Sequence, residues 1–290
     1  MSYSFARHET FHIRTGWLRK GLKAIEKNNH IFLETIPAMD ELGIGKNMIS
    51  SLRYWLQVTG LTEEDYDSNR QKIQEKKELT GIVLNYDEYF EDPSTFWLLH
   101  FNLCRNKEVA TTWYWFFNHF NYLEFDKELF VEELINYIRR TGEEPPAKSS
   151  LEKDFNTFKR MYLYDPEDNN SPEDSLQSPF SELKLITKVD TDTYAVNRPS
   201  IDTLPPRILF YSLLLSLEAG TKSVNVEEVL NQENSIGRLF KLNISLLYEY
   251  LEKLQEIGYL HLDKHAGLNS IQLRELSQDK VLEDYYGIKK

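Results

Sequence analysis

The stretch that organises the chain is PAMDELGIGKNMISSLRYWLQVTGL, residues 37–61. Pro37 suits the first position of a helix, so residues 38–42 are expected to form one short helix. The Gly-Ile-Gly that follows breaks this helix, and a second helix is expected to begin at Lys46. The pattern predicts a helix-turn-helix, with an αα-hairpin whose polar side only faces water as the alternative.

A helical projection of the second helix separates an apolar face from a polar face. At about 100° per residue, one side gathers the large apolar side chains. These are Met48, Ile49, Leu52, Trp55 and Leu56. The other side holds Lys46, Asn47, Ser50, Ser51, Arg53, Tyr54 and Gln57. This outward face contains no carboxylate, and its cations, amides and hydroxyls suit phosphates and base edges, so it is predicted to contact DNA.

The charge of the chain is unevenly distributed. The formal net charge is -12, which by itself disfavours a nucleic-acid partner. Residues 1–60 hold 8 Lys and Arg against 5 Asp and Glu, residues 61–180 hold 13 against 25, and residues 181–290 hold 13 against 16. Because charges are screened over about 10 Å at moderate salt, the basic N-terminal region can attract phosphate despite the acidic middle. The predicted DNA contacts are Lys46, Asn47, Ser50, Arg53, Arg7, Arg14 and Lys20.

Composition limits the class of protein. The chain has 290 residues, of which 41% are hydrophobic and 13% aromatic, which suits about two domains with real cores and excludes a disordered chain. Cys104 stands alone in an aromatic helical run, so a buried, reduced thiol is expected. No apolar run reaches about 18 residues, and the N-terminus does not resemble a signal peptide. We expect a cytoplasmic protein with no membrane partner.

Two groups of side chains could serve catalysis. His8 and Glu9 are adjacent, but neighbours point apart on a strand or helix, so a structural or DNA-contacting role is favoured. An acidic cluster before Pro93 could hold Mg2+ for phosphodiester chemistry, although acids before a helix also stabilise its dipole. The catalytic candidates are His8, Glu9, Asp87, Glu91, Asp92 and His100. No metal site is assigned, and no cofactor is evident other than Mg2+ for a nicking enzyme.

The remainder of the chain divides into four kinds of segment. Residues 62–78 are strongly charged and are expected to form a solvated linker or an exposed helix. Residues 79–140 are dense in aromatics and are expected to form a buried helical core. Residues 166–179 are acidic and rich in proline, which predicts a flexible loop. Residues 185–196 are expected to form a hairpin whose turn is at residues 190–192.

The last segment has the element order of a winged helix. Residues 206–290 are expected to form a buried helix, two short helices, a long helix capped by Asn243 and two strands. On the long helix the outward face contains Glu249, Glu252 and Glu256, which would repel phosphates. The prediction is that these glutamates bind a protein partner, and that DNA is touched, if at all, through the wing at Lys264 and His265.

Together these patterns predict a mainly α fold with minor β structure. The predicted organisation is an N-terminal helix-turn-helix region (1–62), a central aromatic-rich helical domain (63–165), a flexible acidic loop (166–180) and a C-terminal winged-helix domain (181–290).

Four separated strings of the chain resemble one bacterial protein family. They are residues 8–18 (HETFHIRTGWL), 42–48 (LGIGKNM), 87–100 (DEYFEDPSTFWLLH) and 110–118 (ATTWYWFFN). The family has no assigned domain function and is encoded in DNA phosphorothioation gene clusters, beside sulfurtransferases similar to phosphoadenosine phosphosulfate reductases. A DNA-nicking component of an antiphage system is similar to this family.

The resemblance implies a part in replacing a non-bridging phosphate oxygen of DNA with sulfur. It implies that the protein recognises or nicks DNA while a sulfurtransferase and an ATPase supply the other steps. It also makes Lys46 and Asn47 expected DNA contacts, and His8, Glu9 and Arg14 functional candidates.

Two other functions fit the same residues. A transcriptional regulator would use both helix-turn-helix units on an operator, as a symmetric dimer. An interaction scaffold would use the acidic middle and the glutamates of the last long helix to hold basic partners.

Overall fold

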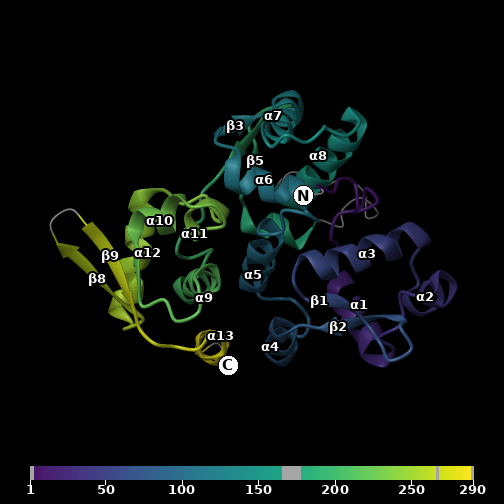
Figure 1. The fold of residues 1–290 in the computed structure, drawn as a ribbon, viewed down its shortest axis with the longest axis horizontal. Coiled ribbons are helices and arrows are strands. Elements are labelled where there is room, and N and C mark those ends of the chain that lie inside the picture. The colour runs from purple at the N-terminus through teal and green to yellow at the C-terminus, as the bar shows by residue number, and fades with distance from the viewer. Residues whose placement is uncertain (1–2, 165–177, 266–267, 289–290) are drawn as a thin grey trace. The chain divides into compact units, whose positions relative to one another are not determined.

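The structure is a computed structural model that describes residues 3–164, 178–265 and 268–288 (Figure 1). The chain divides into two compact units, residues 1–197 and residues 198–290. The predicted division at residues 62, 165 and 180 is finer than this and stays a prediction. Most of the predicted flexible loop, residues 166–179, lies outside the described residues.

The first unit is mainly helical (Figure 1). Its helices are α1 (Trp17–Lys27), α2 (Thr35–Leu42), α3 (Lys46–Val58), α4 (Glu78–Tyr86), α5 (Pro93–Cys104), α6 (Thr111–His119), α7 (Lys127–Arg140), α8 (Lys148–Tyr162) and the 3-10 helix η1 (Pro179–Leu183). Its strands are β1 (Thr62–Tyr66), β2 (Lys72–Lys76), β3 (Glu124–Phe125), β4 (Leu163–Tyr164), β5 (Ile186–Lys188) and β6 (Tyr194–Val196). The last four strands form one sheet in the order β3-β6-β5-β4, in which β4 and β5 run parallel.

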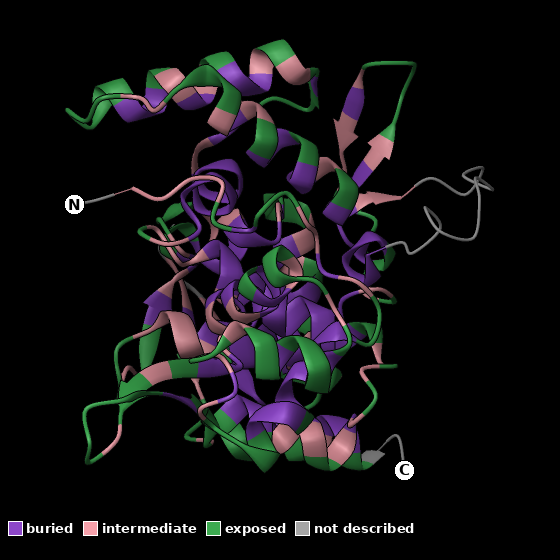
Figure 2. Ribbon diagram, turned by 90° about the vertical axis from the view of Figure 1, so that its right-hand side faces the viewer, coloured by how far each residue is buried: buried purple, intermediate pink, exposed green. Residues whose placement is uncertain are grey.

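The core of the first unit is aromatic, as the composition of residues 79–140 predicted (Figure 2). Helices α5 and α6 are buried on nearly every side. The largest fully buried side chains here are Trp55, Trp97, Phe101, Trp113, Tyr114, Phe116, Phe117, Phe130, Phe158, Tyr162 and Phe180. Each buried ring removes about 150 to 250 Å2 from water, so these side chains supply a large share of the hydrophobic stabilisation.

The structure corrects the prediction for residues 62–78. Most of this charged segment is an antiparallel hairpin, β1 paired with β2, and not a linker or an exposed helix. The turn is set by Asp67, whose carboxylate accepts the N–H groups of Asn69 at 2.9 Å and Gln71 at 2.8 Å. Thr62 of β1 and the neighbouring Ile73 and Gln74 of β2 are buried, while most of the other hairpin side chains are exposed. Successive residues of a strand point to opposite faces, so both faces of β2 contribute a buried side chain.

The expected hairpin at residues 185–196 is confirmed. Strands β5 and β6 pair antiparallel, with Ile186 opposite Val196 and Lys188 opposite Tyr194. Asp190 closes the turn, because its carboxylate accepts the N–H groups of Asp192 and Thr193, both at 3.1 Å.

The second unit contains the four helices and two strands that the sequence predicted, and in addition a strand, β7, and a last helix, α13, that it did not predict. Its elements are α9 (Pro206–Ser216), β7 (Ser223–Asn225), α10 (Val226–Asn231), α11 (Ile236–Leu239), α12 (Ile244–Glu256), β8 (Leu260–His265), β9 (Leu268–Leu273) and α13 (Gln278–Ile288). The strands form one sheet in the order β7-β9-β8. Across the described parts of both units, every helix is too short or too polar to span a bilayer.

Candidate nucleic-acid interface

The junction of α2 and α3 depends on a glycine. Gly43 ends α2 with φ 59° and ψ 36°, the left-handed region that glycine adopts without steric cost, and its N–H donates to Met39 O at 2.8 Å. Gly45 is the extended N-cap residue of α3. Two consecutive helices are therefore joined by residues 43–45 (Figure 1).

The apolar face of α3 is buried as predicted. Ile49, Leu52, Trp55 and Leu56 are buried, and Met48 is half-buried. On the opposite side Lys46, Asn47 and Ser50 are exposed, and they define what we call the open surface of α3.

The projection is wrong for two residues of the outward face. Ser51 and Tyr54 are buried, because other segments of the first unit cover them. The Ser51 hydroxyl donates to the carbonyl of Phe11 at 3.3 Å, and Trp55 Nε1 donates to the same carbonyl at 2.9 Å. The Tyr54 hydroxyl donates to Val109 O at 3.3 Å. Residues 3–14, the N-terminal arm, therefore take part of the surface that the projection assigned to DNA.

The N-terminal arm is fixed by a buried pair, His8 and Asp154. His8 Nε2 lies 2.9 Å from Asp154 Oδ1, and the two side chains are 0% and 1% exposed. The backbone N–H of Thr10 donates to His8 Nδ1 at 3.1 Å, so Nε2 carries the proton that bonds to the carboxylate. Asp154 Oδ1 also accepts the N–H of Ala6 at 2.7 Å, and Oδ2 accepts the hydroxyl of Thr112.

The N-terminal arm also contains three residues with an unfavourable backbone conformation. Ala6, Glu9 and Thr10 have φ of 55°, 50° and 65°, the left-handed region that is unfavourable for residues with a Cβ. The hydrogen bonds around His8 offset this strain. The pair thus holds the arm against α8 at one end, while Phe11 bonds to α3 at the other.

Arg53 does not stand free on the outward face. Its guanidinium forms an ion pair with Glu64 of β1, and Lys72 Nζ of β2 lies 2.6 Å from the same carboxylate. Burial lowers the pKa of Arg53, and the positive charge of nearby Arg7 lowers it further. Arg7 therefore lies close to this network. Gln57 donates to Gln74 of β2 at 3.1 Å. The hairpin that sequence reasoning missed therefore engages the C-terminal half of the predicted DNA face.

The other predicted cations lie around the same helices. Arg14 lies 5.4 Å from the ring centre of Trp17, an arrangement typical of a cation–π contact. Lys20 is exposed on α1, and its Nζ lies 3.9 Å from the position that a Cβ on Gly43 would take. Lys20 therefore stands at the α2–α3 junction, near the start of α3 and Lys46.

The acidic candidates form a capped loop. Asp87 is buried, and its carboxylate accepts the N–H groups of Glu91 at 2.8 Å and Asp92 at 3.3 Å and the hydroxyl of Thr95 at 2.6 Å. Burial raises the pKa of Asp87, and these hydrogen bonds oppose the rise. Asp92 caps α5 by accepting the N–H of Ser94 at 3.0 Å. The arrangement supports the helix-capping interpretation of this cluster.

The histidine candidates are enclosed. His100 is 0% exposed, and its Nδ1 lies 2.7 Å from the hydroxyl of Tyr162. His8 is bonded as described above, while Glu9 is exposed beside it. The fold therefore places neither histidine ring in contact with solvent.

The second unit exposes the glutamates of α12 as predicted. Glu249, Glu252 and Glu256 are exposed, and Lys253 Nζ pairs with Glu256 at 3.0 Å. Ile244 and Ile257, which the projection placed inward, are 46% and 39% exposed, because they stand at the two ends of the helix. Of the predicted wing, Lys264 and His265 fall at the end of β8, and their side chains lie outside the described residues.

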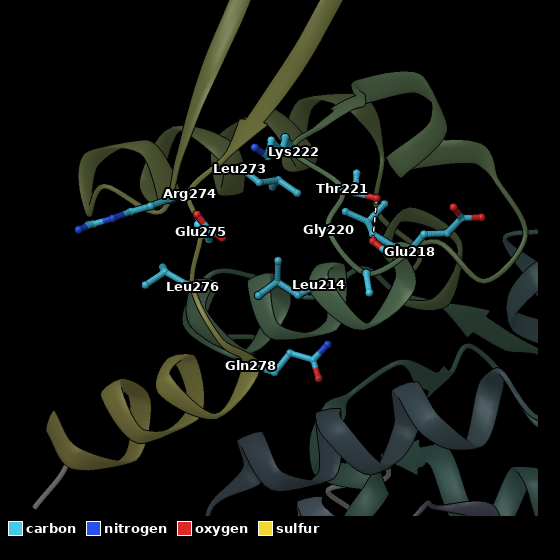
Figure 3. A pocket seen from close by; sticks show the side chains of 12 residues that line it. Leu214, Glu218, Gly220, Thr221, Lys222, Leu273, Arg274, Glu275, Leu276 and Gln278 are labelled. Atoms are coloured by element: carbon cyan, nitrogen blue, oxygen red, sulfur yellow. Dashed lines mark hydrogen bonds between the residues drawn. The ribbon is translucent and has the colours of Figure 1, made fainter.

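A hollow of about 380 Å3 opens in the second unit between the end of α9 and the segment joining β9 to α13 (Figure 3). Leu214, Leu273 and Leu276 line it. Arg274 and Glu275 also border it, and the Arg274 guanidinium donates to Gly258 O at 3.4 Å. Its polar groups have opposite charges and do not converge on one point, so the hollow defines no ligand class.

Fold and site together define a mainly helical protein of two units, the first of which carries a small, open, polar and cationic surface at a junction of two helices. The chain belongs to the DUF4007 family, proteins of unknown function, whose model matches residues 5–286. No curated protein matches the chain.

Two crystal structures of SspB are similar to this protein. The magnesium-bound SspB structure has a TM-score of 0.87 and 28% sequence identity, over 98% of this chain and 88% of that chain. The second SspB structure has a TM-score of 0.86 and 29% identity over the same shares.

Mg2+ is held in proteins by carboxylates together with waters or phosphates. Within residues 3–164, 178–265 and 268–288, no three His, Cys, Asp or Glu side chains come close enough together to hold a metal. The Asp87 carboxylate is already occupied by backbone and hydroxyl donors. Among the described residues the structure identifies no set of three such magnesium ligands.

Proposed function

We propose that this protein is the DNA-binding component of a bacterial DNA phosphorothioation system. The observation that carries the proposal is the open surface of α3, where Lys46, Asn47 and Ser50 are exposed and no carboxylate stands on the helix, while Lys20 Nζ lies next to Gly43 at the α2–α3 junction. A lysine near phosphates, with amide and hydroxyl groups near base edges, suits a duplex. The similarity to SspB and the family resemblance support the choice of system.

In this proposal α2 and α3 act as a helix-turn-helix and α9–β9 as a winged helix. The protein works in the cytoplasm with a sulfurtransferase similar to phosphoadenosine phosphosulfate reductases and with an ATPase. Glu249, Glu252 and Glu256 of α12 are exposed and repel phosphates, so we assign them to a protein partner.

Fluorescence anisotropy with a labelled duplex, measured across a range of salt concentrations, tests the DNA-binding proposal. Lys46→Ala is expected to weaken binding and to lower the salt slope by about 1. The matched control is Lys148→Ala, an exposed lysine in the first turn of α8. Equal binding by the wild type and Lys46→Ala, or an equal loss in the control, removes α3 from the DNA site.

Nicking is tested separately. Supercoiled plasmid is incubated with the protein in the presence and absence of Mg2+, and open-circular product is measured. Glu9→Gln and Glu91→Gln change the exposed candidates, and His8, Asp87, Asp92 and His100 are replaced in parallel with unfolding controls, because they support the fold. If no open-circular product appears, the protein binds DNA without cleaving it.

A further inference from the structure

The outward face of α2 carries exposed apolar side chains beside the carboxylate of Asp40. Ile36 is 72% exposed, Leu33 is 42% exposed and Met39 is 38% exposed. Ile36 and Met39 are three residues apart on one helix and so are neighbours on its surface. Ala38 and Leu42 on the opposite side are buried at 0% and 1%, so they already supply the contacts of α2 with its own core. We call Ile36 and Met39 of α2, together with Leu33 two residues before the helix, the α2 apolar face.

Exposed apolar side chains gathered on one helix mark an interaction site more often than scattered ones do. An apolar stripe at a spacing of three residues is the pattern by which a helix inserts into a groove of a partner protein. The α2 apolar face has this pattern.

The charges around the face select the partner. Glu34, Asp40 and Glu41 lie on α2 or at its N-cap, and this segment carries no Lys or Arg. Lys27 Nζ pairs with Glu41 at 2.6 Å, while Glu34 and Asp40 stay exposed. These carboxylates repel phosphates, so α2 does not face DNA. A second copy of this chain would bring the same carboxylates and its own net charge of -12.

We infer that the α2 apolar face docks into an apolar groove, edged with lysines or arginines, on a protein partner. The inference rests on the proposed function and names where that partner binds. Because α2 and α3 are joined by residues 43–45, cations of the partner would lie near the open surface of α3 and would add positive charge beside bound DNA. This gives an acidic chain a way to retain a polyanion.

The test uses the full chain and the purified sulfurtransferase and ATPase of the proposed system. Binding of each is measured by isothermal titration calorimetry. One of them is expected to bind the wild type, and Ile36→Glu is expected to weaken that binding at least about tenfold by placing a charge in the groove. Asp40→Asn is expected to reduce the salt dependence of binding. Val189→Glu, at an apolar residue that is 52% exposed elsewhere in the first unit, is the matched control and is expected to bind normally.

Four results overturn the inference. They are binding of neither protein by the wild type, unchanged binding by Ile36→Glu, an equal loss in Val189→Glu, and a loss of DNA affinity in Ile36→Glu as large as that in Lys46→Ala. The last result would assign α2 to DNA. Thermal unfolding of each variant separates loss of binding from loss of fold. Fluorescence anisotropy of the wild type with DNA is measured independently. If the wild type binds DNA but neither protein, the docking inference is wrong and the proposed DNA binding is not affected.

Discussion

Helices α3 and α12 are the same length in sequence and differ in what surrounds them. Each has 13 residues, a buried apolar stripe and a polar outward face. The polar side chains of α3 are partly taken by the N-terminal arm and by the β1–β2 hairpin, which leaves Lys46, Asn47 and Ser50 open. The glutamates of α12 all stay exposed. A polar face on a helix therefore becomes an available surface only where the rest of the fold leaves it uncovered.

The largest effect is expected where α3 is fixed by the arm. Asp154→Ala leaves the N–H groups of Ala6 and His8 and the hydroxyl of Thr112 without their acceptor in a buried site. Each unsatisfied buried group costs about 1 to 3 kcal/mol, so the free energy of unfolding should fall by about 3 kcal/mol or more. Urea denaturation measures the change.

The control for this change is Asp154→Asn, which keeps one acceptor oxygen and should lose less. One hydrogen bond contributes about 1 kcal/mol to stability. If Asp154→Ala lowers the free energy of unfolding by less than about 1 kcal/mol, the arm does not depend on this pair.

The next effect concerns charge on the two outward faces. Ser50→Glu places a carboxylate on the open surface of α3, which makes it similar to α12, and should weaken DNA binding about tenfold through repulsion of phosphate. The triple variant Glu249→Gln, Glu252→Gln, Glu256→Gln should bind DNA as the wild type does, because α12 is assigned to protein. Anisotropy measures both. A gain of DNA affinity in the triple variant would place α12 near the duplex.

The helices α3 and α12 also differ in their N-terminal caps, and the expected effect on stability is smaller. The Asn243 carboxamide accepts the N–H of Leu246 at 2.8 Å at the start of α12, whereas Gly45 gives α3 no side-chain cap. Asn243→Ala should lower the free energy of unfolding of the second unit by about 1 kcal/mol. Gly45→Ala, which meets no atom within 4 Å, is the comparison and loses no cap. Equal losses in the two variants would show that the Asn243 bond does not stabilise α12.

The smallest effect tests the hairpin. Glu64→Gln removes the charge that pairs with Arg53 and Lys72. Released Arg53 should strengthen DNA binding about two- to threefold and raise the salt slope by up to about 1. Anisotropy at several salt concentrations measures this. Unchanged affinity and slope would show that Arg53 does not reach DNA even without its partner.

Local patterns predicted most of the helices, although α2 begins at Thr35 and not at Pro37, and α13 was not predicted. Glycine at residues 43 and 45 set the junction of α2 and α3, and the spacing of Ile49, Leu52 and Leu56 set the buried side of α3. The aromatic density of residues 79–140 predicted the helical core. These features depend on backbone preferences and on periodicity, which act over a few residues.

The errors arose where distant segments meet. Ser51 and Tyr54 look outward on a helical projection, because nothing in residues 46–58 indicates that the N-terminal arm and Val109 lie against them. The charged strands β1 and β2 were missed, although Asp67 at the turn carried a weak signal.

The amino-acid sequence by itself determined most of the helical segments, the apolar side of α3, and that residues 1–60 carry a net positive charge. Only the tertiary structure decided that Arg53 pairs with Glu64, that His8 bonds to Asp154, and that Ile36 stays exposed. The physical reason is the separation along the chain over which each interaction acts. Helix propensity and periodicity act between neighbours in the chain, whereas ion pairing and burial depend on residues brought together from far apart.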